Sequence, residues 1–84
     1  MQAVGPQPSQ QGRVLAADGG ANVVVISLGA EDGVKEGFEY RVSRGSNYVG
    51  RIRITNVESK KSAGRSIMDL QKSPIQPGDL ITSR

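Results

Sequence analysis

The chain has no cysteine, no histidine and no tryptophan among its 84 residues. Without cysteine, it can form neither a disulfide framework nor a thiolate site. Without histidine, it lacks the commonest metal ligand and the commonest general base near neutral pH. These absences disfavour catalysis and metal chemistry, and we expect no catalytic residues, no bound metal and no cofactor.

Long apolar runs are also missing. No stretch approaches the roughly 18 to 20 apolar residues that span a bilayer as a helix, so the sequence predicts no membrane-spanning segment. The first residues, MQAVGPQPSQQ, have little to bury and lack the basic and apolar regions of a signal peptide. We expect a flexible leader over 1–11 and a single domain over 12–84, and a start this short and polar also fits a boundary inside a longer protein.

The rest of the chain contains short apolar or alternating segments between turn residues. The β-branched run Val23–Ile26 is typical of a strand buried on both faces, and the loop that follows it, with Gly33 and Gly37, is interpreted as a crossover between two core strands. Phe38, Tyr40 and Val42 alternate with polar residues, as in a half-buried strand. The pattern as a whole predicts six strands, over 12–17, 23–26, 38–43, 48–57, 62–68 and 80–83.

Glycines and prolines divide these segments. Asp18-Gly19-Gly20 provides residues that tolerate positive φ in a tight hairpin, so the first two strands should pair antiparallel. Gly50 and Gly64 interrupt strands, where they predict bulges or barrel corners. The segment 69–73 fits either a short helical turn or a loop. We therefore predict an all-β fold, a small six-stranded, mostly antiparallel closed barrel with short hairpins.

Two segments of the chain resemble each other. GVKEGFEYRVSR (33–44) and PIQPGDLITSR (74–84) share an aliphatic residue, two polar or proline positions, a glycine and then a strand ending in Ser-Arg. A glycine-containing loop before a strand lets the backbone cross the end of a barrel. Two such loops would suit the two ends or the two halves of the barrel.

Several short motifs together resemble a known domain. They are G-x-V at 12–14, VVVISLG at 23–29, D-G-V-K-x-G at 32–37, V-x-R at 42–44, YVGRIRITNV at 48–57, S-A-G at 62–64 and I-x-x-G-D-x-I at 75–81. This combination, which covers 12–84, is similar to the C-terminal domain of flagellar assembly protein T and to related small β-barrels of bacterial envelope proteins. The resemblance implies a six-stranded barrel that serves as an assembly or protein-interaction module, usually attached to other segments and often periplasmic.

Charge is unevenly distributed along the chain. Residues 1–40 carry two basic and five acidic side chains, whereas residues 41–84 carry nine basic and three acidic ones, which predicts an acidic loop edge and a basic sheet face. The candidate partner-binding residues are Arg41, Arg44, Tyr48, Arg51, Arg53, Lys60, Lys61 and Arg65. Such a face fits docking to a protein, binding to nucleic acid or simple solvation; for nucleic acid, only Tyr48 is left as an exposed stacking residue.

Other chemistries fit the sequence poorly. Glu31, Asp32, Glu36 and Glu39 lack the alternating Asp/Asn positions of a calcium loop, and a barrel filled by its own side chains offers no cleft for a pair of catalytic carboxylates. No phosphate-binding glycine motif precedes a helix.

The sequence thus predicts a non-enzymatic interaction or assembly module of a bacterial envelope-associated protein, docking to another protein or self-associating. Strand 80–83 offers an exposed edge for a partner's sheet. The alternative is a nucleic-acid-binding barrel that uses the basic strand face. We expect a periplasmic or envelope location, with a cytoplasmic one left open.

Overall fold

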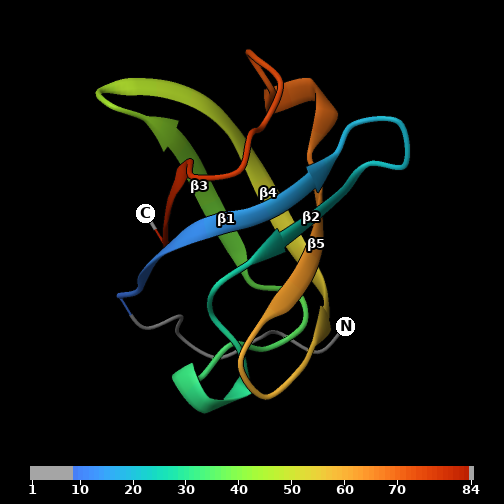
Figure 1. Cartoon of the computed structure of the whole chain (residues 1–84), viewed down its shortest axis with the longest axis vertical. Helices are drawn as coiled ribbons and strands as arrows, with labels where there is room; N and C mark the ends of the chain where they lie inside the picture. Colours follow the sequence, from blue (N-terminus) through green and yellow to red (C-terminus); the bar gives the residue numbers. More distant parts are fainter. Residues whose placement is uncertain (1–8, 84) are drawn as a thin grey trace.

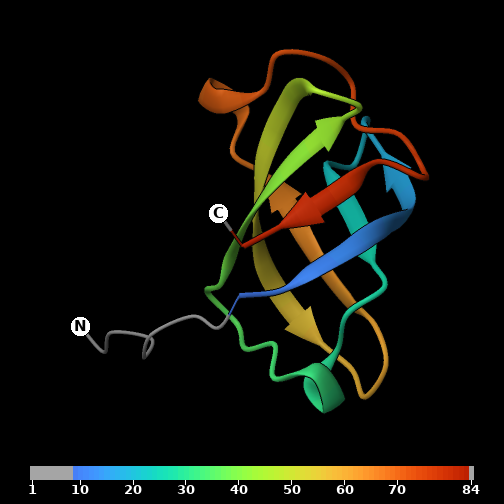
Figure 2. The same cartoon turned by 90° about the vertical axis from the view of Figure 1, so that its left-hand side faces the viewer.

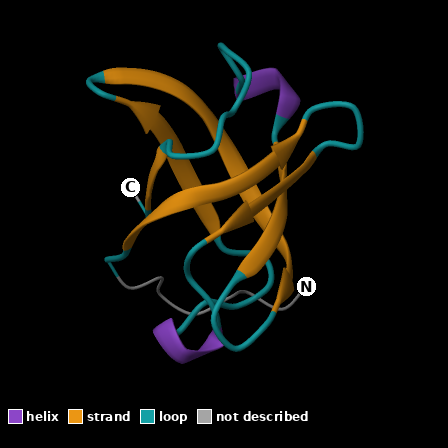
Figure 3. Cartoon of the chain, viewed as in Figure 1, coloured by secondary structure: helices purple, strands orange, loops and turns teal. Residues whose placement is uncertain are grey.

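The computed structural model describes residues 9–83, which form a closed barrel of six strands (Figures 1 and 3). The predicted all-β, antiparallel closed barrel is confirmed. The first eight residues of the predicted leader lie outside the described residues, and the first strand begins at Gln11. The strands are β1 Gln11–Asp18, β2 Val23–Ile26, β3 Glu39–Arg44, β4 Asn47–Val57, β5 Ser62–Ser66 and β6 Leu80–Thr82, and the two 3-10 turns are η1 Ala30–Asp32 and η2 Met68–Leu70.

The order of strands around the barrel is β1-β2-β5-β4-β3-β6, with every neighbouring pair antiparallel. Exchanging β1, β2 and β3 with β4, β5 and β6 leaves this ring unchanged, so the two halves of the chain have the same topology. Each half is a hairpin followed by a loop that crosses one end of the barrel. The crossing loops lie at opposite ends, one carrying η1 and the other η2 (Figures 1 and 3).

These crossing loops confirm the internal similarity found in the sequence. Gly37 (φ 91°) and Gly78 (φ 92°) occupy equivalent places just before β3 and β6, in a left-handed conformation that favours glycine. Val34 is buried in the first loop, and Ile75 packs against the core from the second. Both loops therefore close the barrel with an aliphatic side chain and then turn sharply into a strand.

The core is formed by side chains that alternate along each strand. Tyr40 and Val42 of β3 are fully buried, as are Ile52 of β4 and Ile81 of β6. The period of two that predicted a half-buried strand at Phe38–Val42 is confirmed. Tyr40 also donates a hydrogen bond from its hydroxyl to Oε1 of Gln10, at 2.6 Å.

Strand β2 differs from its prediction. Val24 and Ile26 are buried, but Val23 and Val25 are only half-buried, because they point out of the barrel. A closed barrel has one filled face and one outer face. The apolar run was therefore wrongly interpreted as buried on both sides.

The two glycines predicted to interrupt strands lie beside register shifts. The β3–β4 register shifts between Val42 and Ser43, next to Gly50, and the β4–β5 register shifts opposite Gly64. A Cβ on Gly64 would lie 2.5 Å from the carbonyl oxygen of Arg53, so no larger residue fits without moving the backbone. The prediction of bulges near both glycines is confirmed.

Three local predictions need correction. The left-handed residue of the first hairpin is Asn22 (φ 53°), not Gly19 or Gly20, and its side chain is held by the backbone of Ser66. The segment 69–73, predicted as a helical turn or a loop, overlaps the helical turn η2, which begins at Met68. The turn η1 was not predicted. Strand β6 pairs with both β1 and β3, so it has no edge to offer a partner (Figure 2).

Candidate interaction surfaces

Four of the predicted basic residues lie on the outer side of β3, β4 and β5. Arg41 of β3 lies opposite Arg51 of β4, and Arg53 of β4 lies between Glu39 of β3 and Arg65 of β5. The alternation that buries Tyr40, Ile52 and Ile54 places these residues outward. We call Arg41, Arg51, Arg53 and Arg65 the arginine face.

Glu39 lies within the arginine face and holds two of its members. Its Oε1 accepts a hydrogen bond from Nε of Arg51 at 3.1 Å, and its Oε2 accepts from Nη2 of Arg53 at 2.8 Å and from Nε at 3.2 Å. The hydrogen bond from Arg53 is the main reason why the pKa of Glu39 lies below its ordinary value, with the bond from Arg51 adding to it against the opposing effect of burial. Glu39 is therefore a carboxylate at neutral pH, and the face keeps an excess of positive charge.

Tyr48 lies at the edge of the arginine face that is nearest to η2. The guanidinium of Arg41 lies over its ring, 5.4 Å from the centroid, which is within range of a cation–π interaction. The Tyr48 hydroxyl donates to the carbonyl oxygen of Leu70 at 2.7 Å. Tyr48 thus fixes Arg41 and links the face to η2, while one side of its ring is already covered.

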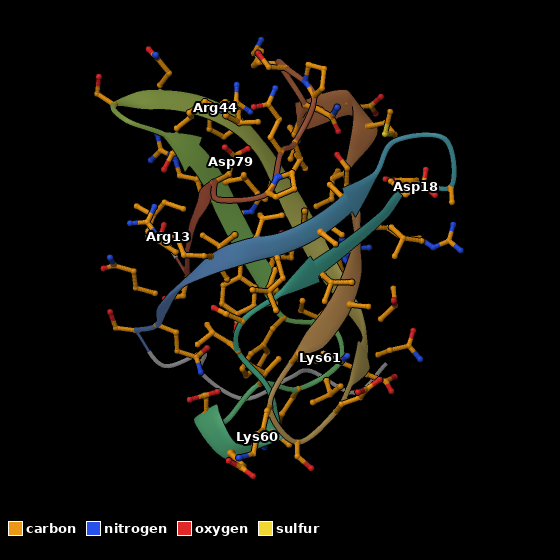
Figure 4. All side chains as sticks on the ribbon, viewed as in Figure 1. Arg13, Asp18, Arg44, Lys60, Lys61 and Asp79 are labelled. Carbon is orange, nitrogen blue, oxygen red and sulfur yellow. The ribbon has the colours of Figure 1, made fainter. Side chains whose placement is uncertain are left out.

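The other three basic candidates lie elsewhere. Arg44 forms a two-pronged ion pair with Asp79, through Nε to Oδ1 at 2.8 Å and Nη2 to Oδ2 at 2.9 Å, and it also donates to the carbonyl of Pro74 (Figure 4). Lys60 and Lys61 lie in the β4–β5 turn at the end of the barrel that carries η1 (Figure 4). Arg44 therefore has a structural role, and the two lysines form a separate surface.

The Asp79 carboxylate is the most enclosed charge in the described part of the chain, with 3% of its side chain exposed. Burial by itself would raise its pKa, but the hydrogen bonds from Arg44 and from the N–H of Gln76, together with the charge of Arg44, outweigh burial and lower the pKa below its ordinary value. The sequence did not reveal this pair, because its partners are 35 residues apart.

A second surface, also missed, lies across β1, β2 and β5. Its outward side chains are Leu15, Ala16, Val23, Val25 and Ala63, and we call it the apolar strip. Val25 lies between Ala16 of β1 and Ala63 of β5, and Leu15 is 51% exposed at the bulge of β1. The signal in the sequence was the uninterrupted run of valines.

A small pocket of about 110 Å³ opens near the first hairpin, between Asn22, Ser66, Met68 and Ile75. Its polar groups bind one another: the Asn22 side chain pairs with the backbone of Ser66, and the Ser66 hydroxyl donates to Oε1 of Gln71. No pairing of a nucleophile with a base is present among the residues lining this pocket.

Neither a metal cluster nor a membrane helix is found between residues 9 and 83. No three acidic side chains in this range come together in a way that could hold a metal ion. Likewise, none of the helical segments there has the length and apolar character needed to cross a membrane. Comparison of the chain with family models, with curated proteins and with solved structures gives no match. The resemblance to the flagellar assembly protein T domain stays a prediction.

Proposed function

We propose that this chain is a non-enzymatic interaction module that docks an acidic segment of another protein onto the arginine face. The observation that carries the proposal is the juxtaposition of four outward arginines on three adjacent strands, with one carboxylate among them. Guanidinium groups match carboxylates in shape and charge, and they are more weakly hydrated than lysine ammonium groups. Arginines are accordingly enriched at protein interfaces.

The arginines are also held in place before a partner arrives. Arg51 is held by a hydrogen bond from its Nε to Glu39. Arg53 is held by hydrogen bonds from Nε and Nη2 to the same carboxylate, and Arg41 is steadied by the ring of Tyr48. Fixing a side chain before binding reduces the conformational entropy lost on binding, which is about 0.5 to 1.5 kcal/mol for each flexible side chain.

An acidic protein segment fits this face better than nucleic acid does. A single-strand binder needs exposed aromatic rings, but Phe38 and Tyr40 are buried and one side of the Tyr48 ring is covered by Arg41. These features support the docking proposal over the nucleic-acid alternative.

The test compares two variants that remove the same charge. Arg51→Gln combined with Arg53→Gln weakens the arginine face, and Lys60→Gln combined with Lys61→Gln is the control at the end of the barrel. Each is titrated by fluorescence anisotropy with a labelled Glu/Asp-rich peptide and with labelled poly(dT), at low and at physiological salt.

We expect the face variant to lose at least about tenfold in peptide affinity, and the lysine variant less than about threefold, since each charge-assisted contact contributes on the order of 1 kcal/mol. Equal losses in both variants would mean that net charge alone attracts the peptide, which contradicts the proposal. Tighter binding to poly(dT) than to the peptide, with a steep salt dependence, would favour the nucleic-acid alternative.

We also propose that the module works at the bacterial envelope, which rests on the resemblance stated above. The test is fractionation of cells with an antibody against the barrel. Recovery of the full-length gene product from the cytoplasm alone would contradict this location.

A further inference from the structure

The apolar strip is the outer surface centred on β2, on the opposite side of the ring from β3. Figure 1 shows β1 and β2 crossing the front of the barrel, with β5 beside them. Val23 and Val25 are half-buried, and the main contacts of β2 are with its neighbours β1 and β5 in the sheet.

Charges of opposite sign flank this strip on its two sides. Asp18 lies opposite Val23 on β1, and one further step of the β2–β5 register places Arg65 opposite Val23 on β5. One row of the sheet thus reads Asp18, Val23, Arg65, and the adjacent row reads Ala16, Val25, Ala63. Asp18 accepts only from the N–H of Ala21 within the described residues, and Arg65 forms no ion pair among them.

This arrangement is self-complementary under one particular symmetry. A two-fold axis that runs along β2, in the plane of contact, exchanges the β1 side of one copy with the β5 side of the other. Val23 and Val25 then meet their counterparts, Ala16 faces Ala63, and each Asp18 faces Arg65 of the other copy. We propose that a second copy of this chain covers the apolar strip in such a two-fold dimer. The proposal shares Arg65 with the arginine face, whose other three arginines lie on β3 and β4, outside the apolar strip.

The packing of the surface suits a dimer of this kind. Two sheets packed face to face keep their strands within about 30° of each other, which an axis along β2 allows. The small side chains Ala16 and Ala63 let the two sheets approach, and the two-fold closes the assembly at two copies.

The test exchanges the charges at positions 18 and 65 and measures the mass of the assembly in solution. Sedimentation equilibrium from micromolar to millimolar concentration is run on the wild-type chain, on Asp18→Arg, on Arg65→Asp and on the chain carrying both substitutions. Because the two-fold doubles every contact, each single variant creates two like-charge pairs, and we expect its dimer dissociation constant to rise at least about tenfold. The double variant restores both opposite-charge pairs and should return to within about threefold of wild type on the same reasoning.

Two further variants test whether the dimer forms through the apolar strip and not through another surface of the barrel. Val25→Lys should yield a monomer, and Ser46→Lys, which adds the same charge in the exposed β3–β4 turn, should leave the dimer intact. Thermal melts establish that all variants are folded. The proposal is overturned if the wild-type chain is monomeric at millimolar concentration, if it grows beyond a dimer, if Val25→Lys still dimerises, or if the double variant associates no better than the single ones.

Discussion

Removal of the Arg44 side chain should destabilise the barrel more than any other single arginine substitution among the described residues. Arg44→Ala leaves the Asp79 carboxylate enclosed, and among residues 9–83 the N–H of Gln76 is then its remaining hydrogen-bond donor. Breaking a fully buried ion pair costs about 3 to 5 kcal/mol. Because 41% of the Arg44 side chain is exposed, water can enter the space it leaves, and we expect a smaller loss of about 2 kcal/mol.

This loss depends on pH in a defined direction. The folded pKa of Asp79 lies below its ordinary value of 3.8, so the pair stabilises the fold fully above that value and the stabilisation disappears as the pH falls through the folded pKa. The difference between wild type and Arg44→Ala should therefore be constant near neutral pH and shrink below about pH 4. In Asp79→Asn, the acid-dependent part of the stability from this site should be absent.

Thermal unfolding followed by circular dichroism measures these effects. A loss of about 2 kcal/mol corresponds to a fall in Tm of roughly 8 to 16 °C for a domain of this size. Arg13→Ala is the matched control, since Arg13 reaches the same loop but its side chain donates to the neutral carbonyl of Gly78, at 3.3 Å, and it should lose less than about 0.5 kcal/mol. Equal losses in the two variants, or a loss in Arg44→Ala that persists unchanged at pH 3, would refute the reasoning.

Three other predictions concern the core and a turn. Burial, aided by the charge of Asp32, raises the pKa of Tyr40 to about 12, so the fold should lose about 2 to 3 kcal/mol as the pH rises from 10 to 12; a titration at 295 nm in Tyr48→Phe follows Tyr40 alone, and a value near 10 would contradict this. Ser62→Ala should raise the free energy of unfolding by about 1 kcal/mol in urea titrations, because the buried Ser62 hydroxyl has no hydrogen-bond partner in the described structure. Gly37→Val should lose about 2 kcal/mol because φ is 91° there, whereas Gly19→Ala, with open space around it and no left-handed φ, should be nearly neutral in the same assay.

Most of the fold could be predicted from local patterns in the sequence. The alternation at Phe38–Val42 and the glycines at 50 and 64 are set by neighbours along the chain or directly across a hairpin, and the predictions made from them are confirmed. The order of strands around the ring depends on contacts between distant segments. Local periodicity does not contain those contacts, so the double pairing of β6 was missed.

The candidate surface was only partly predictable for the same reason. Strand alternation identified Arg41, Arg51 and Arg53 as outward, and their register brings them together as expected. Arg44 has the same residue type but is the last residue of β3, and the crossing loop brings Asp79 against it. A charged residue near the end of a strand can form an ion pair with a residue of a loop, and the sequence alone does not say which loop lies against it.

The apolar strip and the arginine face are outer surfaces of one barrel, which is built from two halves of the chain. The halves share their topology, yet the outward residues of β2 and its neighbours Leu15 and Ala16 on β1 are apolar, whereas those of β4 are mainly charged or polar. Since β2 and β3 lie on opposite sides of the ring, a dimer formed through the apolar strip would use Arg65 but leave Arg41, Arg51 and Arg53 of both arginine faces accessible. Two linked faces would bind a partner with repeated acidic segments far more tightly than one face does, without any new contact. Self-association and docking would then act together, because dimerisation converts a weak electrostatic surface into a bivalent one.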